Sequence, residues 1–285
     1  MAAAQKPASF SRRDILKGVA AAAVGTVVGT ADYGYVYARH HVGLTRENVR
    51  VSGLSPELDG LRIGFLSDLH RSDTVSHELA SAAVNLLMAE RPDIIMLGGD
   101  YVTWGGGRNR RFVTAAAEAL APLTAPHGVF AILGNHDDDK DMPAALSLKG
   151  FTVLRDARTR IQVRGVSLDI AGIRFWTRKP SDISRVTKGA APDLILLAHT
   201  PSRLVEAGAL AIPLVLSGHT HGGQIVLPGV GAIAAREFPV VQGIGRQGVT
   251  SIFVTRGVGT VYIPVRVNCP PEVAVLTLEP FTRLA

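Results

Sequence analysis

The chain has 285 residues, of which 47% are hydrophobic and 19% are charged, which excludes a disordered chain and a multispan membrane protein. The formal net charge is +6, but the sequence has no arginine-rich helix and no interleaving of basic and aromatic residues, so nucleic acid is not an expected partner. The single cysteine, Cys269, excludes an intramolecular disulfide and a cysteine-rich metal cluster. Any metal ligands must therefore be histidine, carboxylate or amide groups.

The N-terminus predicts an export signal. Arg12 and Arg13 precede Ile-Leu-Lys, and residues 18–31 then contain no charged side chain. A basic segment ahead of a short apolar run is typical of a signal peptide, and the paired arginines resemble a twin-arginine (Tat) signal. The uncharged run is shorter than the ~20 residues that span a bilayer, which favours a signal peptide. A membrane anchor with its arginines held inside is the alternative.

This reading divides the chain into three parts. Residues 1–38 are expected to be the twin-arginine signal or membrane anchor, residues 39–48 a linker, and residues 49–285 one folded domain. The expected location is the periplasm or the outer face of the cytoplasmic membrane, and the Tat export machinery is the expected partner. A retained anchor would add membrane association.

From residue 61 onward, apolar runs alternate with helical patterns. The runs 61–66, 94–97 and 129–133 predict buried strands, and the patterns at 79–87 and 115–123 predict helices between them. Alternation of strand and helix predicts a parallel sheet with crossover connections.

The second half of the domain predicts another sheet. Residues 161–170 indicate a hairpin around Arg164-Gly165, and strands at 194–197 and 214–216 flank a helix at 203–210. Further strands are predicted at 252–255, 262–267 and 273–278. We therefore expect an α/β fold with two packed mixed β-sheets flanked by helices, in four layers ordered α/β/β/α.

Five of the predicted strands end in residues that can bind a cation. Taken singly, each group could be a capping aspartate, an asparagine in a turn or a core histidine. Five in succession instead predict one site, because open α/β sheets bind ligands at the carboxyl ends of their strands, and neutral imidazoles suit divalent metals. The groups are Ser67-Asp68-Leu69-His70, Gly98-Gly99-Asp100-Tyr101, Gly134-Asn135-His136-Asp137, Ala198-His199-Thr200-Pro201 and Gly218-His219-Thr220-His221.

The order D-x-H, GD, GNHD, a lone H and GHxH is the signature of the calcineurin-like metallophosphoesterase superfamily, which residues 61–224 resemble. The trailing Gly222-Gly223-Gln224 and Gly257-Val258-Gly259 resemble its small bacterial branch. The resemblance implies the four-layer sandwich of that family and two divalent ions, which are manganese, iron or zinc for such nitrogen and oxygen ligands. It implies Asp68, His70 and His221 on one ion, Asn135, His199 and His219 on the other, and Asp100 bridging both.

His136 is the expected catalytic residue. The resemblance places it beside the ions without binding them, and imidazole titrates near the working pH, so it is the candidate proton donor to the leaving group. Asp137 is expected to be a loop residue near the ligands, and Arg71 either reaches a substrate phosphate or forms a surface salt bridge. Trp104 and the three glycines after it are expected to be an exposed turn or a mobile substrate loop.

The expected function is metal-dependent hydrolysis of a phosphodiester, phosphomonoester or pyrophosphate bond in a cell-envelope small molecule or lipid. The second motif lacks the GDxxDRG continuation of Ser/Thr protein phosphatases, since Tyr101-Val102-Thr103 follows Asp100, so a phosphoprotein substrate is not expected. One alternative is a pyrophosphatase acting on UDP-2,3-diacylglucosamine, although that substrate is cytosolic and the signal points outward. Another is a non-catalytic metal-binding envelope protein, for which His136 would have no use.

Overall fold

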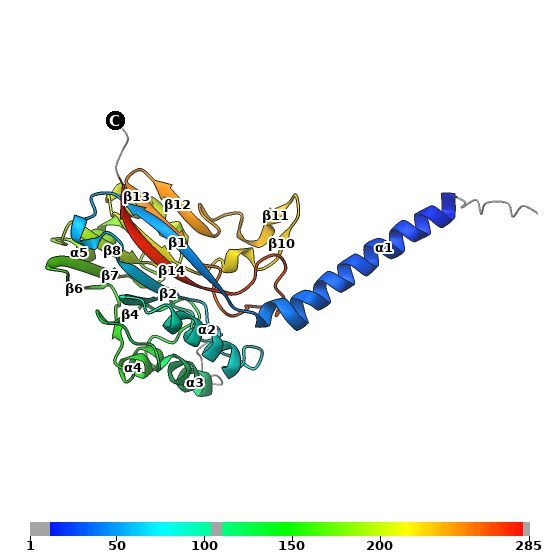
Figure 1. Ribbon diagram of the computed structural model, residues 1–285, viewed down its shortest axis with the longest axis horizontal. Coiled ribbons are helices and arrows are strands. Elements are labelled where there is room, and N and C mark those ends of the chain that lie inside the picture. The colour runs from blue at the N-terminus through cyan, green and yellow to red at the C-terminus, as the bar shows by residue number, and fades with distance from the viewer. Residues whose placement is uncertain (1–11, 104–109, 282–285) are drawn as a thin grey trace, which may run out of the picture.

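The computed structural model describes residues 12–103 and 110–281. Two six-stranded sheets pack face to face, and helices cover their outer faces (Figure 1). The strand order is β1-β14-β2-β3-β4-β5 in the first sheet and β12-β13-β9-β8-β7-β6 in the second. This is the four-layer α/β/β/α arrangement predicted from the sequence.

The first sheet is built on three parallel strands joined by helical crossovers. β2 pairs with β3 and β3 with β4, all in parallel, so their carboxyl ends lie at one edge. In chain order, this half contains β1 (Gly43–Val51), β2 (Arg62–Leu66), α2 (His77–Ala89), β3 (Ile94–Leu97), α3 (Arg110–Leu120), β4 (Val129–Ala131), α4 (Asp141–Ser147), β5 (Thr152–Val153) and the returning β14 (Glu272–Pro280).

The second sheet repeats the parallel arrangement and adds hairpins at its edges. β7, β8 and β9 are parallel to one another, and β6 and β12 pair antiparallel with β7 and β13. Its elements are β6 (Ala157–Val163), β7 (Val166–Gly172), α5 (Pro180–Thr187), β8 (Asp193–Leu197), α6 (Leu204–Ala209), β9 (Leu214–Ser217), β12 (Gly243–Gln247) and β13 (Thr250–Val254). A separate small hairpin joins β10 (Val226–Leu227) to β11 (Gly231–Ala232).

Strand β3 shows why the central strands are continuous apolar runs. Ile94 and Met96 belong to the core between the two sheets, whereas Ile95 and Leu97 belong to the core between the first sheet and its helices. Side chains alternate along a strand, so a strand with both faces covered must be apolar at every position. The core between the sheets includes an edge-to-face contact of Phe65 with Phe253, whose ring centroids lie 6.2 Å apart.

Helix α2 is set by a local capping signal and by one apolar face. The Ser76 side chain accepts the backbone N–H of Leu79 at 3.3 Å, a cap that contributes about 1 kcal/mol. Leu79, Ala83 and Leu87 then lie buried on the side that faces the sheet.

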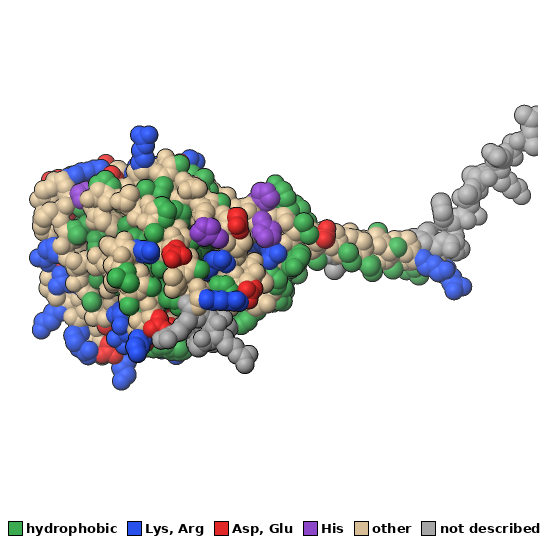
Figure 2. Space-filling model, turned by 90° about the horizontal axis from the view of Figure 1, so that it is seen from below, with side chains coloured by type: hydrophobic (Ala, Val, Ile, Leu, Met, Phe, Trp, Pro, Cys, Tyr) green, Lys and Arg blue, Asp and Glu red, His purple; other side chains and the backbone are tan. Residues whose placement is uncertain are grey.

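The N-terminal helix α1 (Arg12–Asp32) projects from the globular part (Figure 1), with hydrophobic and small side chains along it and basic ones at its far end (Figure 2). It continues through a π-helical turn, η1 (Tyr33–Tyr37), and a short 3-10 turn, η2 (Ala38–His40), into β1. Gly34 anchors its base, because Arg266 N–H donates to the Gly34 carbonyl at 3.3 Å. Among the described residues, no helix combines the length and the hydropathy that a bilayer span requires.

Two boundaries differ from the sequence-based expectation. β1 begins at Gly43, inside the segment predicted as a linker, because it pairs in parallel with β14 from Gly43 opposite Glu272 onward. The strand predicted at 262–267 is wrong, because this segment forms a loop. Pro264 has no backbone N–H to give to a ladder, and Tyr262 has a φ of 59°, which breaks the extended backbone.

Asp169 holds the outer face of the second sheet together. Its fully buried carboxylate accepts hydrogen bonds from Arg160 Nε at 2.7 Å, from the N–H of Ala191 at 2.7 Å and from Arg158. Burial opposes the charge, but the Arg160 hydrogen bond and the other donors outweigh it, so the pKa of Asp169 lies below its ordinary value.

We expect Asp169→Asn to lower the free energy of unfolding at neutral pH by about 2 kcal/mol, because the two guanidinium groups lose a buried charged acceptor. Urea denaturation measures the loss. Because the pKa of Asp169 is lower in the folded protein, its carboxylate stabilises the fold fully above the unfolded-state pKa of about 3.9. This stabilisation is lost as pH falls through the folded-state pKa, so the difference in stability between the variant and the wild type should shrink on acidification.

The matched control is Asp182→Asn, which removes an exposed pair with Arg185 and should change stability by less than about 0.5 kcal/mol. Equal effects of the two substitutions would contradict the structural role of Asp169.

Candidate functional site

The carboxyl ends of five strands, three from the first sheet and two from the second, meet at one edge of the sandwich. Most of the predicted site side chains are buried there, while Asn135 and His219 are partly exposed. Asp68 and His70 follow β2, Asp100 follows β3, Asn135 and His136 follow β4, His199 follows β8, and His219 and His221 follow β9.

The side chains form two clusters that share one carboxylate. The candidate ligand atoms of Asp68, His70 and His221 lie within 4.8 Å of one another, and those of Asp100, His199 and His219 do the same. Oδ2 of Asp100 lies 3.1 Å from Nε2 of His199 and 3.6 Å from Nε2 of His70. One oxygen of Asp100 thus stands between the two clusters.

Asn135 adds an amide oxygen whose surroundings suit a cation. Its Oδ1 is buried and has no hydrogen-bond partner among the described residues. A buried acceptor without a hydrogen-bond partner raises the free energy of the folded protein by about 1–3 kcal/mol, and a bound ligand would remove this cost. The next residue, His136, donates its backbone N–H to Oδ1 of Asp100 at 2.9 Å, so this loop is held against the bridging carboxylate.

The backbone at the site is strained. Asp68, His70, Asp100, His219 and His221 have positive φ angles of 55°, 48°, 54°, 71° and 50°. A residue with a side chain pays of order 1 kcal/mol or more for this left-handed region, and such residues gather at functional sites. Each of these left-handed residues turns its side chain from the end of a strand into the shared cluster.

Two glycines let the carboxylates lie against the backbone. A Cβ at Gly134 would stand 2.0 Å from Oδ1 of Asp100, and a Cβ at Gly218 would stand 2.1 Å from Oδ2 of Asp68. Both distances are far below van der Waals contact, so the motifs GNHD and GHxH require glycine at these positions.

Outer hydrogen bonds orient the histidine rings. Nδ1 of His199 lies 2.7 Å from the Gly98 carbonyl, which can only accept, so Nδ1 carries the proton and the Nε2 edge faces Asp100. The Thr103 hydroxyl lies 3.2 Å from Nδ1 of His70 and directs Nε2 of that ring into the site. Nε2 of His70 and Nε2 of His221 are then 3.0 Å apart.

The electrostatics favour cation binding. Burial lowers the pKa of His70 to about 4 and that of His219 to about 3, so both rings are neutral at pH 7 with lone pairs available. Burial also lowers the pKa of His199, but the Asp100 carboxylate outweighs it and raises that pKa to about 10. A divalent cation would replace the proton of His199 and neutralise the buried carboxylates of Asp68 and Asp100.

Asp137, expected to be a loop residue near the ligands, joins two of the strand ends. Its carboxylate accepts the backbone N–H groups of Asp100 at 2.7 Å, Tyr101 at 2.8 Å and Gly134 at 2.9 Å. The turn after β3 and the turn after β4 are therefore held together by one side chain, and the backbone of Asp100 is fixed from behind.

Within the described part of the chain, Arg71 does not form the surface salt bridge that was one of the two expectations for it. Its Nη1 donates to the Ser72 carbonyl at 2.7 Å and to the Val75 carbonyl, so the guanidinium holds its own loop. The predicted turn at 104–107 lies outside the described residues.

Sequence reasoning missed the role of Arg266. This side chain is fully buried and donates through Nη2 to the carbonyls of Arg256 at 2.9 Å and Gly257 at 3.1 Å. The same Nη2 lies 3.5 Å from Nδ1 of His221. Arg266 therefore supports the loop beside the first cluster, and the resemblance of the C-terminal segment to the bacterial branch was the available signal.

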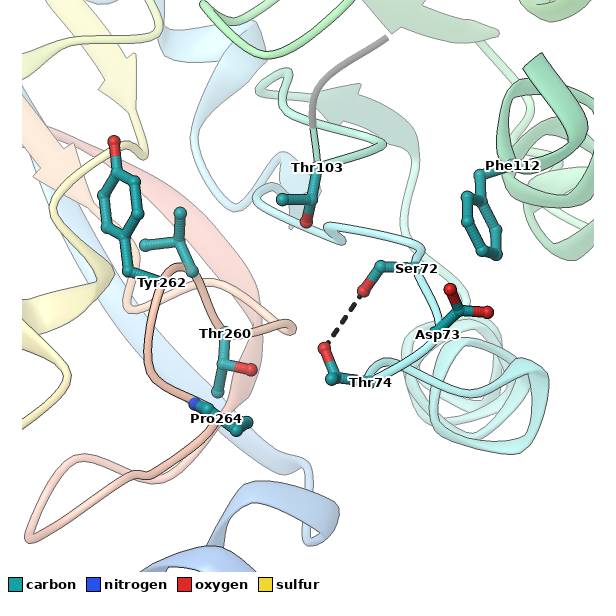
Figure 3. Close-up of a pocket in the computed structure, with 9 residues that line it drawn as sticks. Ser72, Asp73, Thr74, Thr103, Phe112, Thr260, Tyr262 and Pro264 are labelled. Carbon is teal, nitrogen blue, oxygen red and sulfur yellow. Dashed lines mark hydrogen bonds between the residues drawn. The ribbon is translucent and has the colours of Figure 1, made fainter. Parts of the chain in front are cut away.

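Three hollows open beside the clusters. One, of about 470 Å³, is walled in part by His219 and His221. A second, of about 280 Å³, is lined by hydroxyl-bearing residues together with Asp73, Phe112, Val261 and Pro264. Figure 3 shows Ser72 and Thr74 on one of its walls and Thr260 on another. A third, of about 260 Å³, is walled by residues that include Asn135 and His136. A substrate bound at the clusters thus has space on several sides.

Comparison with known proteins gives a family and several similar proteins. The profile of the family described as calcineurin-like phosphoesterase matches residues 61–223. The metallophosphoesterase YkuE of Bacillus subtilis, described as uncharacterized, is 32% identical over 282 residues, which are 95% of this chain and 98% of that protein. Phosphodiesterase YaeI of Escherichia coli is 33% identical over 289 residues, 94% of this chain and 99% of that protein. A solved structure of the NAD nucleotidase of Haemophilus influenzae aligns with a TM-score of 0.49 at 13% identity, covering 70% of this chain and 45% of that one.

We expect Asp137→Asn to weaken the binding of Mn²⁺ about 10- to 100-fold, because the amide places an N–H₂ group where backbone N–H donors need an acceptor and so displaces Asp100. Calorimetric titration of the chelator-treated protein measures the affinity. Asp139→Asn is the control, since Asp139 is exposed and pairs with Arg155 at 3.3 Å. Equal Mn²⁺ affinity in the wild type and both variants would rule out this role of Asp137.

Proposed function

This chain belongs to the calcineurin-like phosphoesterase family, and from that premise we propose that it is a dinuclear phosphodiesterase that acts on a cell-envelope substrate. Membership makes it a metal-dependent hydrolase of phosphoric esters. The observation that carries the proposal is the position of Asp100, whose Oδ2 stands between two clusters of nitrogen and oxygen ligands. The phosphodiesterase activity in the name of the E. coli relative favours a diester over a monoester.

The proposed ligands follow the two clusters. The orphaned Asn135 oxygen, the neutral rings and the shared carboxylate fit a pair of divalent cations, and their donor types suit manganese, iron or zinc. In this assignment Asp68, His70 and His221 hold one ion, Asn135, His199 and His219 hold the other, and Asp100 contacts both.

When bound, the two cations supply an activated water as nucleophile and neutralise charge on the phosphoryl oxygens. The chain's own contribution is to fix their spacing through Asp100 and to hold the rings through Gly98 and Thr103. In the overall reaction, the oxygen of water bonds to phosphorus, the bond from phosphorus to the leaving oxygen breaks, and that oxygen needs a proton.

We assign the donation of that proton to His136. It is 5% exposed, its ring centroid lies 5.0 Å from that of His70, and its backbone is tied to Asp100. Burial lowers the pKa of the His136 imidazole, and an anionic phosphate beside it would raise that pKa again. The imidazolium formed on substrate binding would then act as the general acid. A purely structural metal site would need no such residue.

The cellular location of the protein is part of the proposal. Arg12-Arg13 ahead of the uncharged residues 18–31 supports a twin-arginine signal or anchor in residues 1–38, and the projecting helix α1 lies within this segment. Export through the Tat machinery would deliver the folded enzyme to the periplasm or to the outer face of the cytoplasmic membrane. A phosphodiester of the cell envelope, either a small molecule or a lipid, is the substrate that this location favours.

We expect His136→Ala to keep the metal content of the wild type and to lower kcat about 100-fold for a phosphodiester whose leaving group is an alkoxide, the usual contribution of a general acid. An alkoxide needs a proton to leave, whereas p-nitrophenolate does not. Elemental analysis and a colorimetric assay measure the two quantities. His77→Ala, on the exposed face of α2, is the control and should change neither. Unchanged turnover in His136→Ala would rule out His136 as the acid. Absence of hydrolysis by the metal-loaded wild type would instead favour the non-catalytic metal-binding alternative.

Removal of metal should abolish activity and lower thermal stability, because the buried carboxylates then lose their counter-charge and the lone pairs of the neutral imidazoles lose their partner. A cation present at 100 times its dissociation constant contributes about 2.7 kcal/mol, so the chelated protein should melt several degrees lower and recover with Mn²⁺.

Asp100→Asn should bind fewer ions per chain and lose activity by about 1,000-fold or more, because an amide bridges two cations poorly. Two tightly bound ions per chain in Asp100→Asn would sink the bridging assignment.

A further inference from the structure

The largest of the three hollows beside the clusters is apolar. Its volume is about 470 Å³, within the range of ~300–1,000 Å³ typical of small-molecule sites. His219 and His221 form part of its wall, and Leu227, Ile233 and Phe238 supply much of the rest. The hollow therefore begins at the proposed metal ligands and leads away from them over hydrocarbon surface.

The hydrophobic side chains around this hollow are exposed to solvent. Leu227 is 39%, Ile233 53%, Ile263 56% and Tyr262 80% exposed. Leu227 and Ile233 come from the β10–β11 hairpin and the short helix η7 (Ile233–Ala235), and the other two come from the loop at 261–263. Contiguous exposed apolar surface of this kind marks a binding site rather than an ordinary protein surface.

Both walls of the hollow are anchored to the backbone that follows His221. Gln224 Nε2 donates to the carbonyls of Val261 at 3.2 Å and Ile263 at 2.6 Å, and Gln224 Oε1 accepts the N–H of Val261 at 3.0 Å. On the other side, a Cβ at Gly223 would stand 2.3 Å from Cβ of Ala232, so the hairpin packs directly on this segment. The hollow is thus fixed relative to the metal-binding clusters.

We propose that this hollow binds the apolar arm, an alkyl or acyl chain, of an amphiphilic phosphodiester whose phosphate lies at the metal-binding clusters. The proposal rests on the proposed function and names its substrate class. The occupant must be continuous with the phosphate, because His219 and His221 wall the hollow itself. Glu237 is the acidic residue of this lining, which contains no lysine or arginine among the described residues, so a sugar or nucleotide arm would leave most of its polar groups unpaired there.

The opposite side of Tyr262 offers a place for a polar arm. Tyr262 lines both this apolar hollow and the hollow of about 280 Å³ in Figure 3, where Ser72, Thr74, Thr103 and Thr260 present hydroxyl groups. Its backbone has a φ of 59°, a strained conformation that the Gln224 hydrogen bonds maintain. Tyr262 therefore stands between an apolar hollow and one in which hydroxyl groups and Asp73 lie beside apolar side chains, and the second hollow is the one that offers partners to a polar arm.

The test uses the full-length, Mn²⁺-loaded protein and p-nitrophenyl phosphodiesters whose second ester group is methyl, butyl, hexyl or octyl, each below its micellar concentration. Burial of each methylene should raise kcat/KM about 2- to 4-fold in the wild type. Leu227→Ser and Ile233→Ser should flatten this dependence on chain length, because each replaces hydrocarbon in the wall by a hydroxyl group.

The control is Ile244→Ser. Ile244 lies on β12, away from the lining of the hollow, and its exposure of 45% is close to the 53% of Ile233, so this variant should keep the chain-length dependence of the wild type. All three substituted side chains are partly exposed, and thermal melting of each variant verifies that it folds.

The outcomes separate the inference from the function on which it rests. Ready hydrolysis of the methyl ester with no effect of chain length in the wild type would overturn the apolar subsite and leave the phosphodiesterase intact. A steep dependence that persists in Leu227→Ser and Ile233→Ser would place the chain elsewhere and also overturn the inference. A rise that occurs only above the micellar concentration would indicate binding to a lipid surface instead. Hydrolysis of none of the esters would count against the proposed function itself.

Discussion

The placement of the Asp100 carboxylate is the constraint on which the candidate site depends. It comes from the first sheet, yet its Oδ2 lies 3.1 Å from Nε2 of His199, which comes from the second. The sandwich must therefore bring the carboxyl ends of both sheets together to within hydrogen-bonding distance. Asp137 fixes the Asp100 backbone, the N–H of His136 fixes its side chain, and Gly134 leaves the room that the carboxylate needs.

This arrangement opposes stability locally and is supported by the rest of the fold. Buried carboxylates, buried imidazoles and left-handed backbone each raise the free energy of the folded chain. The compensation comes from cores that lie between the sheets and beneath the helices on both outer faces. The strained residues all sit where parallel strands end, so the regular hydrogen bonding of the strands is kept, and the strain is confined to the turns that present ligands.

The hollows beside the clusters, rather than the clusters themselves, indicate which substrates would fit. Family membership gives the reaction class, because the ligands are common to phosphoesterases of many specificities. The hydrophobic hairpin, the loop clamped by Gln224 and the hydroxyl-lined hollow belong to segments outside the metal-binding motifs. The proposed export and the proposed apolar subsite favour the same class of compound, an amphiphilic diester of the cell envelope.

The sequence by itself determined the elements that depend on local pattern. Buried strands such as β2, β3 and β9 were readable because both of their faces are apolar, and the cation-binding groups were readable because each directly follows a strand. The four-layer architecture followed from the alternation of strands and helices together with the family resemblance.

Tertiary structure alone decided everything that depends on partners distant in the chain. β1 begins at Gly43 because β14 lies more than 200 residues away and offers it an open edge. Residues 262–267 form a loop because their backbone N–H and carbonyl groups form hydrogen bonds with Gln224 and Gly34. The roles of Asp137 and Arg266, like the walls of the apolar hollow, arise where separate segments converge, and no local periodicity encodes such convergence.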